Sequence, residues 1–157
     1  MKHLIIFLLF PFLAAAQPII SCTDMIKPYA DFESPFAFEE TVVALQKELN
    51  SRGITIFATI DHKKAAEAVG ESMQPATMLI VGNPKVGTAL MQENPRFAIE
   101  LPLKILIYEE DKTVKIRYEK VAAIAKKYDI KQNFSTAEKI DSAMQQLIKL
   151  AIGKLGN

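Results

Sequence analysis

The chain has 157 residues, which is enough for one domain with its own hydrophobic core and short for two. It carries 19 Lys and Arg against 18 Asp and Glu, for a formal charge of +1, and it contains no Trp. Nucleic acid and anionic lipid surfaces are therefore not expected as partners, because such binding requires a basic face or aromatic side chains placed between arginines.

Residues 1–16 have the pattern of a secretory signal peptide. Lys2 supplies a positive start, residues 4–13 are apolar, and Ala14 to Ala16 provide small residues for cleavage. The apolar run is broken by Pro11 and is shorter than the ~20 residues that a membrane-spanning helix needs. The pattern predicts export with cleavage and a periplasmic or secreted protein with no transmembrane helix.

Cys22 is the only cysteine, so no disulfide within the chain is predicted and stability must come from packing. It lies in residues 17–25, which are expected to form a flexible tail before a single domain over residues 26–157. Ser21 supplies the small residue that a lipoprotein cleavage site requires before its cysteine. Cys22 therefore has three interpretations: a free thiol, a lipid anchor, or one half of an intermolecular disulfide.

The start of the domain predicts two strands with a helix between them: residues 25–33, 38–52 and 54–60. Gly53 is expected to end the helix, because glycine adopts the left-handed conformation that follows a last helical turn. Alternation along the second strand places Ile54, Ile56 and Ile60 on one face.

Two short helices are each expected to begin at a capping side chain. Asp61 or His62 precedes the first, over residues 63–69, and Asn83 precedes the second, over residues 84–92. Between them, residues 77–81 are apolar at every position but the first, which is typical of a central strand.

The remaining segments predict a hairpin of two strands, a short helix and a long C-terminal helix. The strands are residues 103–108 and 114–118, and the short helix is residues 121–128. Ser135 and Glu138 have the spacing of a capping box at the start of the long amphipathic helix.

Three short motifs follow one another in the middle of the chain: I-D-H at residues 60–62, G-N-P-K-V-G-T at residues 82–88 and L-P-L-K at residues 101–104. Their order and spacing resemble the bacterial domain of unknown function 302, over roughly residues 28–152. Two departures are Ala37, where the family commonly has a capping serine, and the absence of Asn-Asp-Pro after Tyr118.

The resemblance implies an α+β fold of two layers, of the helix-grip or TBP-like type. A mostly antiparallel curved sheet of about five strands would pack on the long C-terminal helix, and a groove between sheet and helix would suit a ligand. It also implies a homodimer.

The candidate ligand-binding residues are His62, Asn83, Lys85 and Lys104. His62 is the only histidine left after signal-peptide removal, and it could serve as a general base or a metal or haem ligand, or simply help to cap a helix. Asn83 and Lys85 could hold an anion with the amides of the next turn, although a plain capped helix explains the same residues. Lys104 is expected to point away from the core, either into solvent or toward an acidic group such as Glu100.

Nucleotide hydrolysis is not expected, because the glycine-bounded segment at residues 82–88 lacks the P-loop lysine. No structural zinc site and no covalent haem are predicted either, since one histidine and one cysteine provide no ligand spacing for them. No resident cofactor is expected. Met73, Met78 and Met91 could join His62 in a soft metal or haem site, but methionines in an apolar chain more often fill the core.

The sequence favours a non-enzymatic periplasmic ligand-binding or accessory module that holds a small or apolar ligand. The first alternative is a small hydrolase or isomerase with His62 as general base and Lys85 or Lys104 stabilising negative charge; no nucleophile motif accompanies it. The second alternative is a partner-docking protein or a metal or haem binder.

Overall fold

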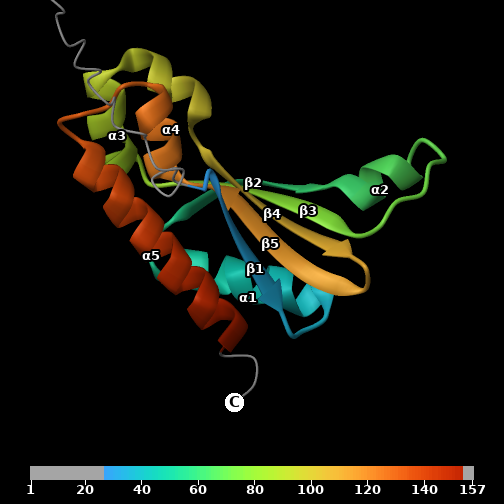
Figure 1. The fold of residues 1–157 in the computed structure, drawn as a ribbon. Helices are drawn as coiled ribbons and strands as arrows, with labels where there is room; N and C mark the ends of the chain where they lie inside the picture. The colour runs from blue at the N-terminus through green and yellow to red at the C-terminus, as the bar shows by residue number, and fades with distance from the viewer. Residues whose placement is uncertain (1–26, 154–157) are drawn as a thin grey trace, which may run out of the picture.

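Five strands form one antiparallel sheet in the order β1-β5-β4-β3-β2 (Figure 1). The computed structural model describes residues 27–153, so the predicted signal peptide and Cys22, with the predicted tail, lie outside the described residues. The strands are β1 Tyr29–Ser34, β2 Thr55–Asp61, β3 Ala76–Gly82, β4 Leu103–Glu110 and β5 Thr113–Glu119.

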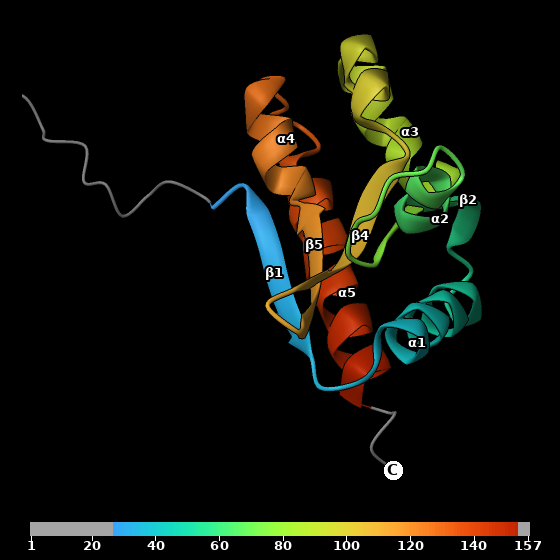
Figure 2. The same ribbon diagram turned by 90° about the vertical axis from the view of Figure 1, so that its right-hand side faces the viewer.

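The helices include one long segment at the C-terminal end and several shorter ones between strands. They are α1 Phe38–Ser51, α2 His62–Glu67, α3 Pro84–Glu93, the 3₁₀ helix η2 Pro95–Glu100, α4 Val121–Lys127 and α5 Phe134–Gly153. Because β1 and β2 are opposite edges of the sheet, α1 must cross the sheet to join them, and it packs against α5 (Figure 2).

The core lies between one face of the sheet and the helices α1 and α5. Leu79, Ile105 and Ile116 from neighbouring strands are fully buried, as are Leu45 on α1 and Leu147 on α5. Alternate strand residues share this face because successive side chains in a strand point to opposite sides. The predicted α+β fold, with a five-stranded antiparallel sheet and a long C-terminal helix, is confirmed, and the sheet is open rather than a closed barrel.

A buried carboxylate ties α4 to α5. Asp141 on α5 accepts hydrogen bonds from the backbone N–H groups of Val121 and Ala122, at 2.8 and 2.9 Å, and so caps α4, which has no capping side chain of its own. Burial raises the pKa of Asp141, and the two N–H donors act in the opposite direction.

Capping residues and a glycine in the sequence predicted several helix ends correctly. The Asp61 carboxylate accepts from the Lys64 N–H at 2.9 Å and begins α2, and the Asn83 side-chain oxygen accepts from the Lys85 N–H at 3.1 Å and begins α3. Gly53 follows α1 with φ of +68°, the left-handed conformation that glycine adopts at low cost.

The predicted face of Ile60 is wrong because β2 contains an irregularity at Phe57. Ile56 pairs with Val81, whereas Ile60 pairs with Met78, and these partners point to opposite faces of β3. The extra residue therefore turns the end of β2 over, as a β-bulge does. Ile54 and Ile56 stay toward the core side, and Ile60 is on the other face, 42% exposed.

The predicted capping box at Ser135 and Glu138 is also wrong. The helix α5 already includes Phe134, so Ser135 lies inside it, and the carbonyl of Asn133 accepts the first bonds from Thr136 and Ala137. The side chain that holds this start in place is Glu93, on α3. The first strand begins at Tyr29; residues 25 and 26 of the longer predicted strand lie outside the described residues.

Candidate functional site

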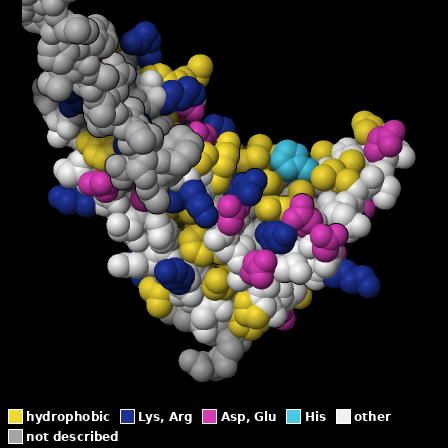
Figure 3. Space-filling view, viewed as in Figure 1, with side chains coloured by type: hydrophobic (Ala, Val, Ile, Leu, Met, Phe, Trp, Pro, Cys, Tyr) yellow, Lys and Arg dark blue, Asp and Glu magenta, His cyan; other side chains and the backbone are white. Residues whose placement is uncertain are grey.

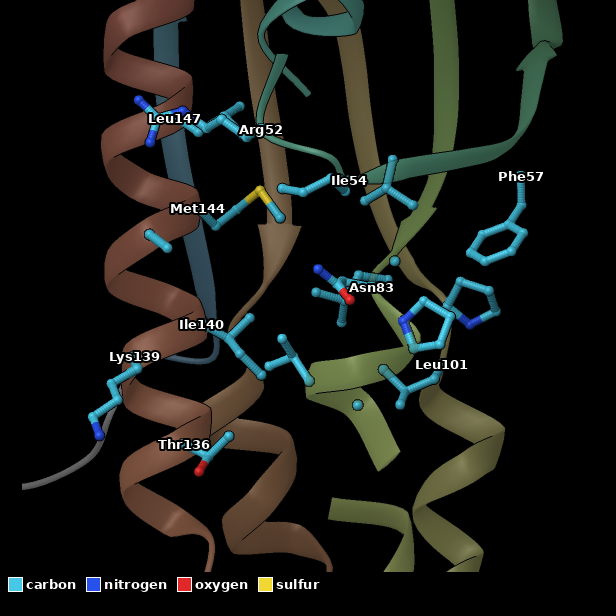
Figure 4. A pocket seen from close by; sticks show the side chains of 18 of the residues that line it. Arg52, Ile54, Phe57, Asn83, Leu101, Thr136, Lys139, Ile140, Met144 and Leu147 are labelled. Carbon is cyan, nitrogen blue, oxygen red and sulfur yellow. The ribbon is translucent and has the colours of Figure 1, made fainter. Parts of the chain in front are cut away.

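An open groove of about 850 Å³ lies between α5 and the ends of β3 and β4. We call it the groove. Figure 4 shows Ile140 and Met144 on α5 directed across it toward Leu101 and Ile54. Its lining residues are Arg52, Ile54, Phe57, Val81, Gly82, Asn83, Pro84, Val86, Gly87, Met91, Ala98, Leu101, Pro102, Leu103, Thr136, Lys139, Ile140, Ala143, Met144 and Leu147.

One side of the groove is a stripe along α5. Its members are three or four residues apart, and this spacing places them on one helix face. They are Thr136, Lys139, Ile140, Ala143, Met144 and Leu147. Met144 and Leu147 pack into the core at the same time, so the stripe is the outer margin of the core-facing surface of α5.

The opposite side of the groove comes from β2, α3 and η2, and two glycines set how closely these segments approach. A Cβ added at Gly82 would lie 3.1 Å from the Phe57 ring, and one at Gly87 would lie 3.0 Å from a Leu101 methyl carbon. Larger residues there would push Phe57 or Leu101, so both glycines help to set the shape of the groove.

Polar side chains in the groove are few. They are Arg52, Asn83, Thr136 and Lys139, and among residues 27–153 the lining includes no Asp or Glu. The guanidinium of Arg52 is paired with Glu48, with Nε and Oε1 at 2.9 Å. Lys139 is exposed and makes no ion pair within the described part of the chain.

Of the four predicted ligand-binding residues, only Asn83 lines the groove. His62 lies at the far end of the β2–β3 pair, next to Asp61, which pairs with Thr77, while Asn83 follows Gly82 at the near end. Half-buried at the start of α2, the His62 imidazole forms no hydrogen bond within residues 27–153.

Lys85 is exposed in the first turn of α3 and does not line the groove. The N–H of Gly87, which the alternative of an anion site would have used, already donates to the Asn83 carbonyl at 3.1 Å. Thr88 donates its hydroxyl to the Pro84 carbonyl at 2.6 Å. The geometry here favours the interpretation of residues 82–88 as a capped helix start.

Lys104 points away from the core, as predicted, and borders a second cavity of about 190 Å³ on the other face of the sheet. Glu100 also lines that cavity. Its carboxylate accepts from the Lys127 ammonium at 2.8 Å and the Tyr128 hydroxyl at 2.6 Å, and these bonds, with the nearby charge of Lys104, hold the pKa of Glu100 below its usual range. The structure therefore separates Lys104 from Asn83 by the thickness of the sheet.

Metal-ligating residues do not converge in residues 27–153, where no group of three His, Cys, Asp or Glu side chains could hold a metal ion. Met91 lines the groove and Met78 lines the cavity on the other face, so two of the three methionines proposed to join His62 lie on opposite faces of the sheet. The face seen in Figure 3 carries Lys and Arg intermingled with Asp and Glu, with apolar side chains between them. In the described part of the chain, no helix combines the length and apolar character needed to cross a bilayer.

Arg52, Phe57, Thr136 and Lys139 were not identified as site residues from the sequence. The sequence predicted the C-terminal helix only as amphipathic; Met144 and Leu147 on its apolar face pack into the core and also line the groove. The available signal was the pair Thr136 and Lys139, two polar residues at helical spacing beside that apolar face.

The chain is similar to known proteins in sequence and in fold. The family model described as "Domain of unknown function DUF302" matches residues 30–150. A crystal structure of an uncharacterized conserved protein DUF302 from Bacillus stearothermophilus superposes with a TM-score of 0.70 at 19% identity, covering 82% of this chain and 98% of that one.

Two curated relatives are larger proteins. The fluoride-specific ion channel FluC 1 of Brucella suis biovar 1 (strain 1330) is 32% identical over 78 residues, which are 50% of this chain and 31% of the channel. FluC 1 of Brucella abortus biovar 1 (strain 9-941) matches at the same identity over 29% of its length. The chain thus spans less than a third of the curated relatives it matches.

Proposed function

The chain belongs to the DUF302 family, and from that premise we propose that it is a non-enzymatic binding or accessory module whose groove holds a small apolar molecule. The signal-peptide pattern of residues 1–16 supports the further proposal that it does so in the periplasm or outside the cell.

The observation that carries this proposal is the size and lining of the groove. A volume of about 850 Å³ lies within the range of ligand pockets in proteins, roughly 300–1,000 Å³. Most of its lining is aliphatic, aromatic or glycine, with a few polar groups. Transfer of an apolar ligand from water into such a site is favourable by about 0.8 kcal/mol for each buried methylene.

The separation of chemically active side chains supports a binding role over catalysis. Thr136 is the only hydroxyl side chain that lines the groove among residues 27–153, and His62, the proposed general base, lies at the far end of β2 and not beside it. Nucleophilic catalysis needs those two groups within hydrogen-bond reach of each other.

One specific observation favours a second candidate function, that of an accessory subunit that binds to a membrane protein. In the Brucella relatives, a stretch similar to half of this chain is part of a longer protein named as a fluoride-specific ion channel. A module that accompanies a channel in one chain in those proteins could act as a separate accessory subunit here. Binding of a small molecule in the groove is compatible with that role.

The test is to fill the groove from α5. Ala143 is exposed on the groove-lining stripe, and Gln146 is also exposed on the same helix but outside the stripe. We expect Ala143→Phe to weaken binding of N-phenyl-1-naphthylamine, an uncharged apolar dye, by about tenfold or more, because the ring takes the place of two or more ligand carbons. Dye fluorescence titrations of the two variants and the wild type provide the measurement.

Gln146→Phe is the matched control and should bind the dye as the wild type does. Equal dye affinity of all three proteins, with circular dichroism showing that each is folded, would show that the dye does not bind in the groove.

A further inference from the structure

The side chain of Asn83 presents a hydrogen-bond donor to the groove. Its oxygen already accepts from the Lys85 N–H at 3.1 Å, which fixes the orientation of the amide, and the NH₂ group has no acceptor among residues 27–153. Figure 4 shows this side chain in the middle of the groove, between α5 and Leu101. Asn83 is half-buried, so a ligand that covered its NH₂ group without offering an acceptor would leave a donor unsatisfied, and a ligand that offers an acceptor at this point is preferred.

The charged side chains that line the groove among residues 27–153 are all positive. Arg52 and Lys139 lie toward opposite ends of the α5 side (Figure 4), and no carboxylate lines the groove within residues 27–153. Arg52 is balanced by Glu48, whereas Lys139 makes no ion pair within residues 27–153. Figure 4 shows the Lys139 side chain directed outward from α5, away from Asn83, so Lys139 would pair with a ligand head at the edge of the groove after a change of its flexible rotamer. A cationic ligand would be repelled by Lys139, and no carboxylate from residues 27–153 lines the groove to pair with it.

Given the proposed function, we propose that the ligand is a free single-chain amphiphile with a carboxylate head, of the fatty-acid type. The carboxylate accepts from the Asn83 NH₂ group and pairs with Lys139, and the hydrocarbon chain lies against Ile140, Met144 and Leu101. A carboxylate suits this position because it only accepts hydrogen bonds and carries the charge that the groove lacks.

The first arm of the test compares heads and chain lengths. Decanoate and decanol, at pH 8 where decanoate is ionised, are titrated into the full chain against the dye. We expect decanoate to bind about tenfold more tightly than decanol, the value of one charge-assisted hydrogen bond. Within the series octanoate, decanoate and dodecanoate, affinity should rise about fourfold for each added methylene.

The second arm changes the proposed head contacts. Asn83→Asp keeps the oxygen that caps α3 but replaces the donor with a second negative oxygen, so decanoate should bind about tenfold or more weakly, while decanol changes by less than about twofold. Lys139→Glu should act in the same direction with a smaller effect. Lys149→Glu, on an exposed part of α5 outside the groove, is the charge-matched control and should leave both affinities unchanged.

Thermal unfolding of each variant excludes loss of folding as the cause, and Asn83→Asp is chosen because aspartate is as good a cap as asparagine. Equal binding of decanoate and decanol, with no effect of either variant, would overturn the carboxylate assignment while dye binding leaves the proposed function intact. Absence of dye, decanoate and decanol binding would overturn both. Dye binding that weakens as protein concentration rises would assign the groove to a second copy of the chain instead.

Discussion

At the scale of single residues, Glu93 connects the two sides of the groove. From the end of α3, its carboxylate accepts three backbone N–H groups of the turn before α5, from Lys131, Gln132 and Asn133, at 2.6, 2.9 and 2.9 Å. The side chain of Asn133 adds a fourth bond at 2.9 Å. These bonds, led by that of Lys131, lower the pKa of Glu93 to about 2. The start of α5 is therefore held to α3 through one carboxylate.

Replacement of Glu93 should make the stability of the fold depend less on pH in the acidic range. Because the folded pKa lies below the unfolded value of 4.5, the contribution of Glu93 is fully present above about pH 4.5 and is lost as pH falls toward 2. We expect Glu93→Gln to lower Tm by several degrees at pH 7, and this difference from the wild type to shrink between pH 4.5 and pH 3. Thermal unfolding across that range is the measurement.

Glu71→Gln, in an exposed loop, is the control and should follow the wild type throughout. A Tm difference between the wild type and Glu93→Gln that stays constant from pH 7 to pH 3 would show that the carboxylate charge does not hold the turn.

At the scale of elements, the two residues of the turn between β4 and β5 adopt backbone conformations that are unfavourable for their residue types. Asp111 and Lys112 have φ of 51° and 61°, the left-handed values of a type I′ hairpin turn, for which Asn-Gly is the preferred pair. The double substitution Asp111→Asn with Lys112→Gly should raise the free energy of unfolding by about 1 kcal/mol. Urea denaturation measures the change, and dye affinity should be unaltered because the turn lies at the end of β4 remote from Leu103.

Lys112→Ala is the control for this turn. It also removes the lysine side chain but retains a Cβ in the left-handed conformation, so no gain is expected. A gain equal to that of the Asn-Gly variant would mean that the backbone conformation is not the cause.

Element boundaries were predictable where the signal is local and not where a distant partner decides. Asp61, Asn83 and Gly53 act within three residues of themselves; the sequence predicted Asn83 and Gly53, and Asp61 as one of two alternatives. The irregularity at Phe57 depends on the register of β2 with β3, and the start of α5 depends on Glu93, which is 40 residues before Asn133. Neither feature can be predicted from the residues that are its neighbours in the sequence.

At the scale of the whole molecule, the motifs predicted the family and the fold better than the site. His62 and Lys104 were chosen as polar residues in recognisable motifs, but the fold places them away from the groove. The groove is made by side chains from four distant parts of the chain, such as Ile54, Leu101 and Met144. Apolar groove residues have the same sequence pattern as core residues, so only the assembled fold separates them.

Native mass spectrometry of the full chain, purified without detergent from a periplasmic fraction, tests the central claim most directly. We expect a discrete extra mass, of a size consistent with an acyl carboxylate, on the wild type and on Gln146→Phe but not on Ala143→Phe. The same spectra report the number of subunits, which the family resemblance predicts to be two. A bare wild-type species, or a bound mass that Ala143→Phe retains, would contradict the assignment of the groove as the ligand site.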